Sequence, residues 1–137
     1  MNLKYMSDMD IFYIYLEPSK AKILTRSSFS EDVAIFVSKE NKNTICGYEI
    51  VNARESFEKN IQFLQLEIKQ LIGVALYFSR SVRQLSQEKM ADSLGIGLTT
   101  YKQIEKGEQN FSIEIFQHMS KQYPEVRKVV AEGLLAS

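Results

Sequence analysis

The hydrophobic pattern of the chain changes its period once, near residue 52. Before that point, apolar and aromatic residues gather in short runs separated by polar residues. The runs span residues 11–16, 21–26, 33–37 and 44–51. Runs this short, rich in β-branched and aromatic side chains, are typical of strands. The Asn-Lys-Asn segment at 41–43 suits the turn of a hairpin. The first 51 residues therefore predict a small antiparallel sheet of four or five strands.

After residue 56 the apolar residues follow a helical period. From Phe57 to Ala75 they recur at alternating spacings of four and three, which places them on one stripe of a helix. Asn52 and Glu55 have the spacing of a capping pair that would begin this helix, and Gly73 marks a weak point or break. We expect one helix that either packs on the sheet or pairs with its equivalent in a second copy of the chain.

Shorter helices follow, and each has a start or stop signal. Ser86 and Ser112 are good N-cap residues. Gly95 and Gly107 occur where a left-handed residue would end a helix. Pro124 suits the first turn of a last helix.

Composition limits the class of protein. The 137 residues contain 45% hydrophobic and 25% charged residues, as in ordinary globular proteins. No apolar run reaches the ~18 residues of a membrane span, and no secretory signal is evident, so we expect a cytoplasmic, nucleoid-associated protein. Seventeen basic residues balance seventeen acidic ones, so binding to nucleic acid would depend on local geometry rather than on a basic tail.

The sequence offers little material for catalysis or for metal binding. Asp8, Asp10 and Glu49 could form a carboxylate cluster, but Asp10 better suits a turn before a strand, in which it bonds to its own backbone. The single cysteine, Cys46, lies in a strand-like run and has only His118 as a partner base. One cysteine and one histidine are too few for a zinc site of the usual kind. We expect no catalytic residue, no metal and no cofactor, which disfavours an enzyme.

The segment 85–107 predicts two short helices that meet at a steep angle. Its apolar residues can form one small core; they are Leu85, Met90, Leu94, Ile96, Tyr101 and Ile104. Ala91 is small enough for the two helices to cross closely, and Gly95 allows the sharp turn between them. This is a helix-turn-helix arrangement, which can project its second helix into the major groove of DNA.

This segment resembles a known DNA-binding family. The matching residues are Leu85-Ser86-Gln87, Met90-Ala91, Gly95-Ile96, Ile104-Glu105 and Gly107. Together they resemble the helix-turn-helix of the Cro/repressor (Xre) family, and with the neighbouring helices the resemblance extends over about 66–123. It implies a five-helix, lambda-repressor-like domain that binds an operator in double-stranded DNA as a homodimer. It also implies that Arg80 and Glu105 form a structural pair.

The resemblance also implies a set of DNA contacts. Leu98, Thr99 and Gln103 match exposed positions of the recognition helix, and Gln87 matches a position that contacts the backbone or an outer base. Thr100 lies close to the path of the backbone. Lys102 matches a position close to the same path. Apart from the resemblance, phosphate contacts could come from Arg83, Lys89, Lys102 and Lys106, with Ser86 and Asn110 as neutral donors.

Two residues depart from the family pattern. Gly97 stands where the family usually has Ser or Thr, so the recognition helix lacks a side-chain cap. Leu98 stands where a polar base-reader is common; it could touch a thymine methyl group or belong to a protein interface. We therefore expect modest specificity in each half-site, recovered by dimerisation. The same two residues motivate an alternative, a protein-interaction module with weak or no DNA binding.

The N-terminal half resembles a small, uncharacterised bacterial family. The resemblance spans about 3–53 and rests on Tyr5, Asp10, Tyr13-Ile14 and the segment GYEIVNA at 47–53. It implies a compact β unit for partner binding or dimerisation but no chemistry. A DNA-binding domain joined to such a module resembles a type II antitoxin, with a cognate toxin as its protein partner. The same arrangement equally fits a phage or stress-response repressor.

The chain is thus expected to be α+β, with an N-terminal sheet, a long helix and a C-terminal helix-turn-helix domain. The expected boundaries are 1–53 for the β domain, 54–72 for a connecting helix and 73–137 for the DNA-binding domain. Two apolar surfaces are candidates for dimerisation, the stripe at 57–71 and the last helix at 126–134.

Overall fold

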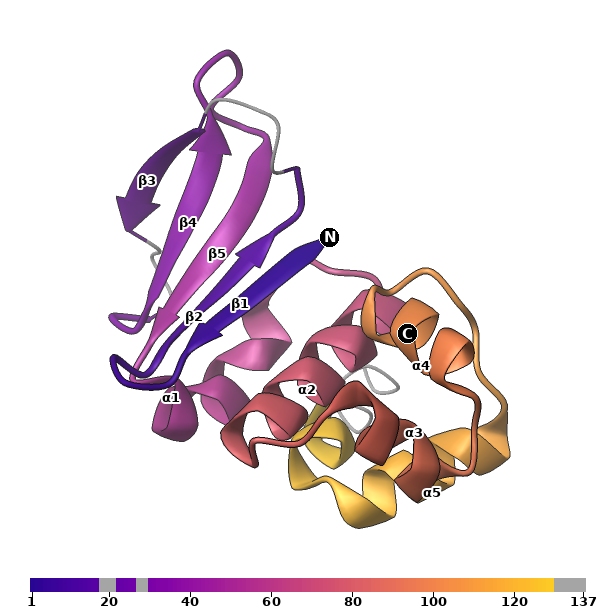
Figure 1. The fold of residues 1–137 in the computed structure, drawn as a ribbon. Helices are drawn as coiled ribbons and strands as arrows, with labels where there is room; N and C mark the ends of the chain where they lie inside the picture. The colour runs from indigo at the N-terminus through magenta and orange to yellow at the C-terminus, as the bar shows by residue number, and fades with distance from the viewer. Residues whose placement is uncertain (18–21, 27–29, 130–137) are drawn as a thin grey trace. The chain divides into compact units, whose positions relative to one another are not determined.

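The computed structural model describes residues 1–17, 22–26 and 30–129 (Figure 1). The chain divides into two compact units, Met1–Phe63 and Leu64–Ser137. The described part of the first unit contains a five-stranded antiparallel sheet followed by a helix, and that of the second unit contains only helices. The predicted α+β fold is therefore confirmed. No helix in the described ranges is long and apolar enough to cross a membrane.

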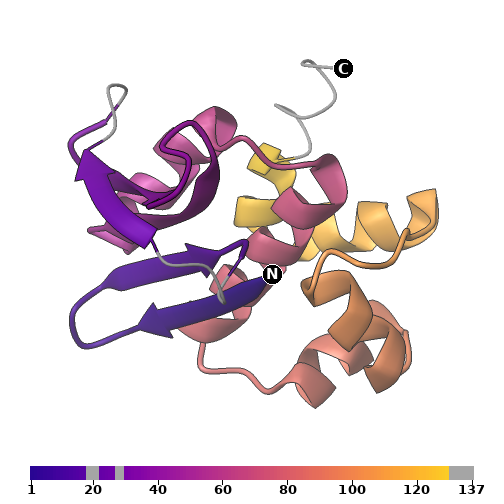
Figure 2. The ribbon, with the colours of Figure 1, turned by 90° about the horizontal axis from the view of Figure 1, so that it is seen from above.

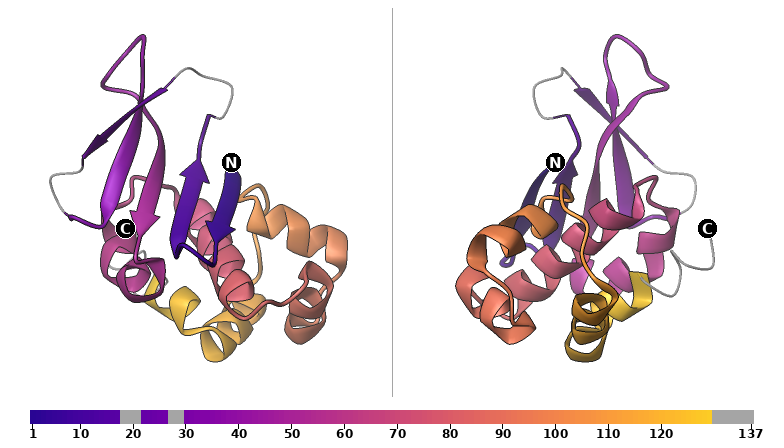
Figure 3. Two further views of the ribbon diagram at one scale, coloured as in Figure 1. Left: turned by 60° about the vertical axis from the view of Figure 1, so that its left-hand side comes forward. Right: turned by 90° about the vertical axis from the view of Figure 1, so that its right-hand side faces the viewer.

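The central strand of the sheet is the last one in the sequence. The strands are β1 (Asn2–Met6), β2 (Ile11–Tyr15), β3 (Lys22–Arg26), β4 (Val33–Ser38) and β5 (Ile45–Val51). Their order is β1-β2-β5-β4-β3, and every neighbouring pair is antiparallel. Figure 3 shows the strong twist of the strands. Strand β1 was not predicted, although its Leu3 and Tyr5 alternate with polar residues as a strand requires.

One face of the sheet forms the core of the first unit. Phe12 and Ile14 of β2 lie opposite Ile50 and Tyr48 of β5, and all four side chains are buried. Helix α1 (Ala53–Asn60) packs on this face, where the ring of Phe57 stacks on Phe12 with 6.0 Å between the centroids. Packing on the sheet, one of the two expected uses of the apolar stripe, is therefore how α1 is stabilised.

The start of α1 is held by an aspartate in the turn between β1 and β2. The Asp10 carboxylate accepts a hydrogen bond from the backbone N–H of Arg54 at 3.1 Å, and its carbonyl accepts one from the N–H of Ala53. The predicted capping pair of Asn52 and Glu55 is wrong, because Asn52 adopts a left-handed conformation (φ 51°) and its side chain makes no cap. Asp10 is therefore a structural residue that links the β1–β2 turn to the helix.

Asp10 also binds Tyr5, which makes the stability of this corner depend on pH. The Tyr5 hydroxyl donates to the Asp10 carboxylate at 2.6 Å. Burial, together with this hydrogen bond, raises the pKa of Tyr5 from 10 to about 12. The folded state thus keeps a proton that the unfolded state releases, so this stabilisation is complete below pH 10 and is lost as the pH rises to about 12.

We expect Tyr5→Phe to remove one late-titrating group from the alkaline titration of the tyrosines, measured by tyrosinate absorbance. Asp10→Asn should move that group to a lower pKa, because it removes the negative charge beside the hydroxyl. An unchanged late titration in Tyr5→Phe would show that another tyrosine is responsible.

The single helix expected from Phe57 to Ala75 is wrong. Helix α1 ends at Asn60, a short 3-10 helix η1 (Ile61–Phe63) follows, and helix α2 (Ile68–Val82) begins anew. The reason is a capping box, in which the Glu67 side chain accepts from the backbone N–H of Gln70 and the Gln70 side chain accepts from the N–H of Glu67. The expected connecting helix at 54–72 is therefore two helices in two different units.

The second unit consists of helices (Figures 1 and 2), and their buried apolar side chains include Leu76, Met90, Ile104 and Met119. After α2 come α3 (Gln87–Leu94), α4 (Leu98–Glu105) and α5 (Ile113–Gln122), and residues 124–129 are also helical. Ser86 caps α3 and Ser112 caps α5, each accepting a hydrogen bond from a backbone N–H three residues later. Both predicted caps are thus confirmed. The expected last helix at 126–134 lies partly outside the described residues, which end at 129.

Gly73 does not break α2; it allows α2 and α4 to touch. A Cβ atom at this position would lie 2.4 Å from the carbonyl oxygen of Glu105 and 2.8 Å from that of Ile104. Both distances are shorter than real Cβ contacts allow. The expectation of a break was therefore wrong, because the missing side chain serves packing rather than flexibility.

We expect Gly73→Ala to lower the free energy of unfolding by about 2 kcal/mol, since overpacking outweighs the gain in helix propensity. Urea denaturation followed by the helical circular dichroism signal measures the change. Gly97→Ser is the matched control, because nothing lies within 4 Å of its Cβ position and the serine should gain a few tenths of a kcal/mol as an N-cap. If Gly73→Ala is as stable as the unaltered chain, α2 and α4 do not approach this closely.

Candidate nucleic-acid interface

The α3–α4 corner has the geometry of a helix-turn-helix. Gly95 ends α3 with φ 69° and ψ 31°, the left-handed conformation that favours glycine. The N–H of Ile96 donates to the Ala91 carbonyl at 3.1 Å, which closes the turn. Ala91 is buried at the crossing of the helices. Only Ile96 and Gly97 separate α3 and its cap from α4, so the direction of α4 is fixed by this turn.

Helix α4 buries one side and exposes the other. Tyr101, Ile104 and Glu105 are buried. Burial, with the nearby Glu105 carboxylate, raises the pKa of Tyr101. The outward side carries the residues predicted to contact DNA, namely Leu98, Thr99, Lys102 and Gln103, with Lys106 at the C-cap. Leu98 and the neighbouring Thr100 are half-buried. The exposed residues are Thr99, Lys102, Gln103 and Lys106.

The outward side of α4 carries no negative charge. Glu105 is the single acidic residue of the helix, and its carboxylate is buried. Lys102 and Lys106 remain exposed. A neutral chain thus presents a locally positive helix face, with hydroxyl and amide groups between the two ammonium groups.

Glu105 is the centre of a polar network that joins three helices. Arg80 of α2 donates two hydrogen bonds to its carboxylate, from Nε at 3.0 Å and from Nη2 at 2.9 Å. Gln87 of α3 donates a third from Nε2 at 3.1 Å. The Arg80 guanidinium also lies over the ring of Tyr77, 5.1 Å from its centroid. Burial alone would lower the pKa of Arg80, but the hydrogen bonds and charge of Glu105 raise it. The network fixes α4 against α2 and α3.

This network changes what Gln87 can do. One of the two N–H groups of its side-chain amide is used inside the protein, so a contact with DNA would come from the second N–H, from the amide oxygen or from the backbone. Ser86 is exposed, and its hydroxyl oxygen accepts from the backbone N–H of Lys89 at 3.1 Å. Both residues therefore support α3 and α4 as well as lying near the expected DNA surface.

Arg83, a predicted phosphate contact, is bound within the helical unit. Its Nη1 donates to the Ser79 carbonyl at 2.9 Å and lies 3.3 Å from the Glu125 carboxylate. Its guanidinium also lies over the ring of Tyr123. Glu125 in turn accepts a hydrogen bond from the buried Ser79 hydroxyl at 2.8 Å. Because Arg83 already pairs with Glu125, we propose that it is not one of the phosphate contacts.

The contacts of Glu125 could not be predicted from the sequence. Arg83 and Glu125 are 42 positions apart, and only the fold brings them together. The hydroxyls of Ser93 and Tyr123 share a hydrogen bond of 2.8 Å, and Gln122 donates to the Ser93 carbonyl. These contacts hold the segment after α5 against α2 and α3.

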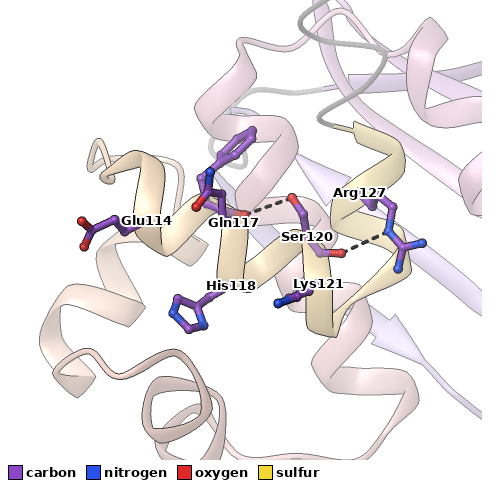
Figure 4. Close-up of a pocket in the computed structure, with 7 residues that line it drawn as sticks. Glu114, Gln117, His118, Ser120, Lys121 and Arg127 are labelled. Carbon is purple, nitrogen blue, oxygen red and sulfur yellow. Dashed lines mark hydrogen bonds between the residues drawn. The ribbon is translucent and has the colours of Figure 1, made fainter.

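A hollow on α5 contains none of the predicted DNA contacts. It is lined by Glu114, Phe116, Gln117, His118, Ser120, Lys121 and Arg127 (Figure 4). Arg127 donates to the Ser120 carbonyl at 3.1 Å, and the Ser120 hydroxyl donates to that of Phe116. His118 is exposed. In the ranges that the structure describes, no three His, Cys, Asp or Glu side chains form a group that could hold a metal ion.

A comparison with known families matches the part of the chain that contains this corner. Residues 80–126 match the family model described as helix-turn-helix, a DNA-binding domain of the Cro/repressor type. No curated protein and no solved structure matches the chain significantly. The matched segment contains the whole α3–α4 corner and α5. It suggests DNA binding and transcriptional regulation for the helical unit.

Proposed function

We propose that the chain is a sequence-specific transcriptional regulator, a repressor that binds its operator as a dimer with α4 in the major groove. The observation that carries this proposal is the outward side of α4, which has two lysines and no carboxylate and is held in place by the buried Glu105 network. A helix fixed on one side and free on the other is what groove recognition requires.

We assign base contacts to the exposed side chains near the start and middle of α4. Gln103 can make a bidentate contact with adenine, and the Thr99 hydroxyl can bond to several bases. Leu98 can pack on a thymine methyl group. Thr100 and Lys102 lie close to the phosphate backbone in this proposal, and Lys89 and Lys106 add phosphate contacts.

Salt dependence of binding tests the phosphate contacts. Three lysines in each of two copies should give a slope of roughly five in log affinity against log salt, at about 0.9 per phosphate. Fluorescence anisotropy with the DNA upstream of the gene measures it. Lys102→Gln and Lys106→Gln should each reduce the slope by roughly one for each copy bound. Arg83→Gln should leave the slope unchanged, because its partner is Glu125. Absence of salt-sensitive binding by folded protein would contradict the proposal.

A second candidate function is that of an antitoxin, in which the β unit binds a toxin protein. Two residues of the helix-turn-helix favour weak DNA binding, as this candidate would allow. Gly97 gives α4 no side-chain cap, and Leu98 cannot donate a hydrogen bond. Copurification from the native source, followed by mass spectrometry, tests this candidate. A stoichiometric small protein partner, released by changes in the first 63 residues and not by Thr99→Ala, would support it; no such partner would oppose it.

A further inference from the structure

The sheet has a second face, opposite the one that α1 covers, which we call the outer sheet face. The strand register places Tyr15, Gly47, Phe36 and Leu24 in one row across β2, β5, β4 and β3. The rings of Tyr15 and Phe36 are half-buried, and Leu24 is 49% exposed. A row of this kind is more apolar than a solvated sheet face usually is.

Charged and polar groups border this row. Tyr13 and Glu49 lie opposite each other in the neighbouring row on the same face. Burial, with the nearby Glu49 carboxylate, raises the pKa of Tyr13. On the other side of the row, the Lys22 ammonium lies 4.7 Å from the centroid of the Tyr15 ring. The outer sheet face thus has an aromatic centre, a carboxylate on one side and an ammonium on the other.

The contacts among the rings disfavour stacking of nucleic-acid bases. The rings of Tyr13 and Tyr15 are nearly parallel, with 5.8 Å between their centroids, and the Phe36 ring lies 5.8 Å from that of Tyr15. A base needs a free ring face, and these faces are largely occupied by each other and by Lys22. Glu49 would also repel phosphates. The Tyr13 hydroxyl is hydrogen-bonded to Glu49, which leaves ring edges and the Tyr15 hydroxyl for a partner, and tyrosines are enriched in protein interfaces.

Two observations favour a second copy of the chain as the occupant. An interface with two-fold symmetry must be complementary to itself, and this face carries both a cation and an anion. In addition, the described parts of the two surfaces expected from the sequence to dimerise are largely used inside the units, with Ile68 of the 57–71 stripe remaining 42% exposed. Phe57 and Ile61 of the 57–71 stripe are buried in the first unit, and Val126 and Val129 are buried in the second.

We propose that the outer sheet face is the interface between two copies of the chain, with Lys22 of each copy facing Glu49 of the other around an aromatic centre. The proposal deepens the proposed function, because it names the surface that would pair two helix-turn-helix units. Only the biological role of the interface rests on the proposed function, since two copies would pair through this face without DNA.

Sedimentation of the full chain without DNA tests the proposal. We expect the unaltered chain to sediment at twice its 15.8 kDa mass. Lys22→Glu and Glu49→Lys should each weaken the dimer at least about tenfold, because the symmetry puts two like-charge pairs into every interface. The double variant Lys22→Glu/Glu49→Lys should restore most of the affinity. Glu58→Lys, an exposed charge reversal on α1, is the control and should leave the dimer intact.

Three outcomes would overturn the proposal. The unaltered chain could be a monomer, which would assign the face to another protein or to the helical unit. The dimer could resist both single charge reversals, or the double variant could fail to recover although circular dichroism shows it folded. DNA titrations of the same samples separate this inference from the proposed function: a charge-sensitive dimer that binds no DNA would uphold the interface and refute the regulator.

Discussion

Glu105→Gln should lower the free energy of unfolding of the helical unit by about 3 kcal/mol. The substitution keeps the shape of the side chain but removes the charge that the Arg80 guanidinium and the Gln87 amide both contact. Arg80, whose side chain is only 18% exposed, would then hold a poorly compensated charge inside the unit. Breaking a buried ion pair from one side costs about 3–5 kcal/mol, and the residual exposure of Arg80 places this case at the low end.

Urea denaturation followed by circular dichroism measures this loss. Glu108→Gln is the matched control, an exposed acid just beyond α4, and should change stability by less than about 0.5 kcal/mol. The double variant Arg80→Met/Glu105→Leu should lie closer to the unaltered chain than Glu105→Gln does, because it leaves no charge unpaired. A loss below about 1 kcal/mol in Glu105→Gln would show that the network is not what fixes α4.

Thr99→Ala/Gln103→Ala should weaken operator binding by at least about 100-fold while leaving the fold unchanged. Both side chains are exposed on α4, and neither forms a hydrogen bond with another of the described residues. A bidentate contact between glutamine and adenine contributes about 1–3 kcal/mol of discrimination, and a dimer makes it twice. The loss should appear mainly for the specific operator, since non-specific binding depends on the phosphate contacts.

Anisotropy titrations with operator and with scrambled DNA separate the two effects. Gln62→Ala is the control, an exposed glutamine in the first unit, and should bind like the unaltered chain. If Thr99→Ala/Gln103→Ala keeps its preference for the operator over scrambled DNA, another surface reads the bases. The alternative of a protein-interaction module would then gain support.

The parts of the fold that could be predicted from sequence are those fixed by local chemistry. Ser86 and Gly95 mark the ends of α3 because a side-chain cap and a left-handed turn involve only neighbouring residues. The strands of the sheet, apart from β1, could be found from their apolar runs. The helix-turn-helix corner also depends mainly on residues that are close in the sequence. Its pattern can therefore be matched to a family from the sequence alone.

The parts that could not be predicted depend on distant residues. The apolar spacing of α1 continues into α2, although α1 buries its apolar residues in the first unit and α2 buries its own in the second. Spacing alone could therefore not show that the stripe belongs to two helices in two units. Gly73 looks like a helix breaker until the carbonyl groups of α4 are placed against it. Arg83 looks like a free cation until Glu125, 42 positions away, is placed beside it.

Selection of binding sites from a random DNA library tests the central claim most directly, namely that the exposed side of α4 reads DNA sequence. We expect the unaltered chain to enrich one family of sites, and Gln103→Ala to lose the preference for one base pair in each half-site while keeping the others. Enrichment of no sequence by the folded chain, or of the same sequences by Thr99→Ala/Gln103→Ala, would contradict it.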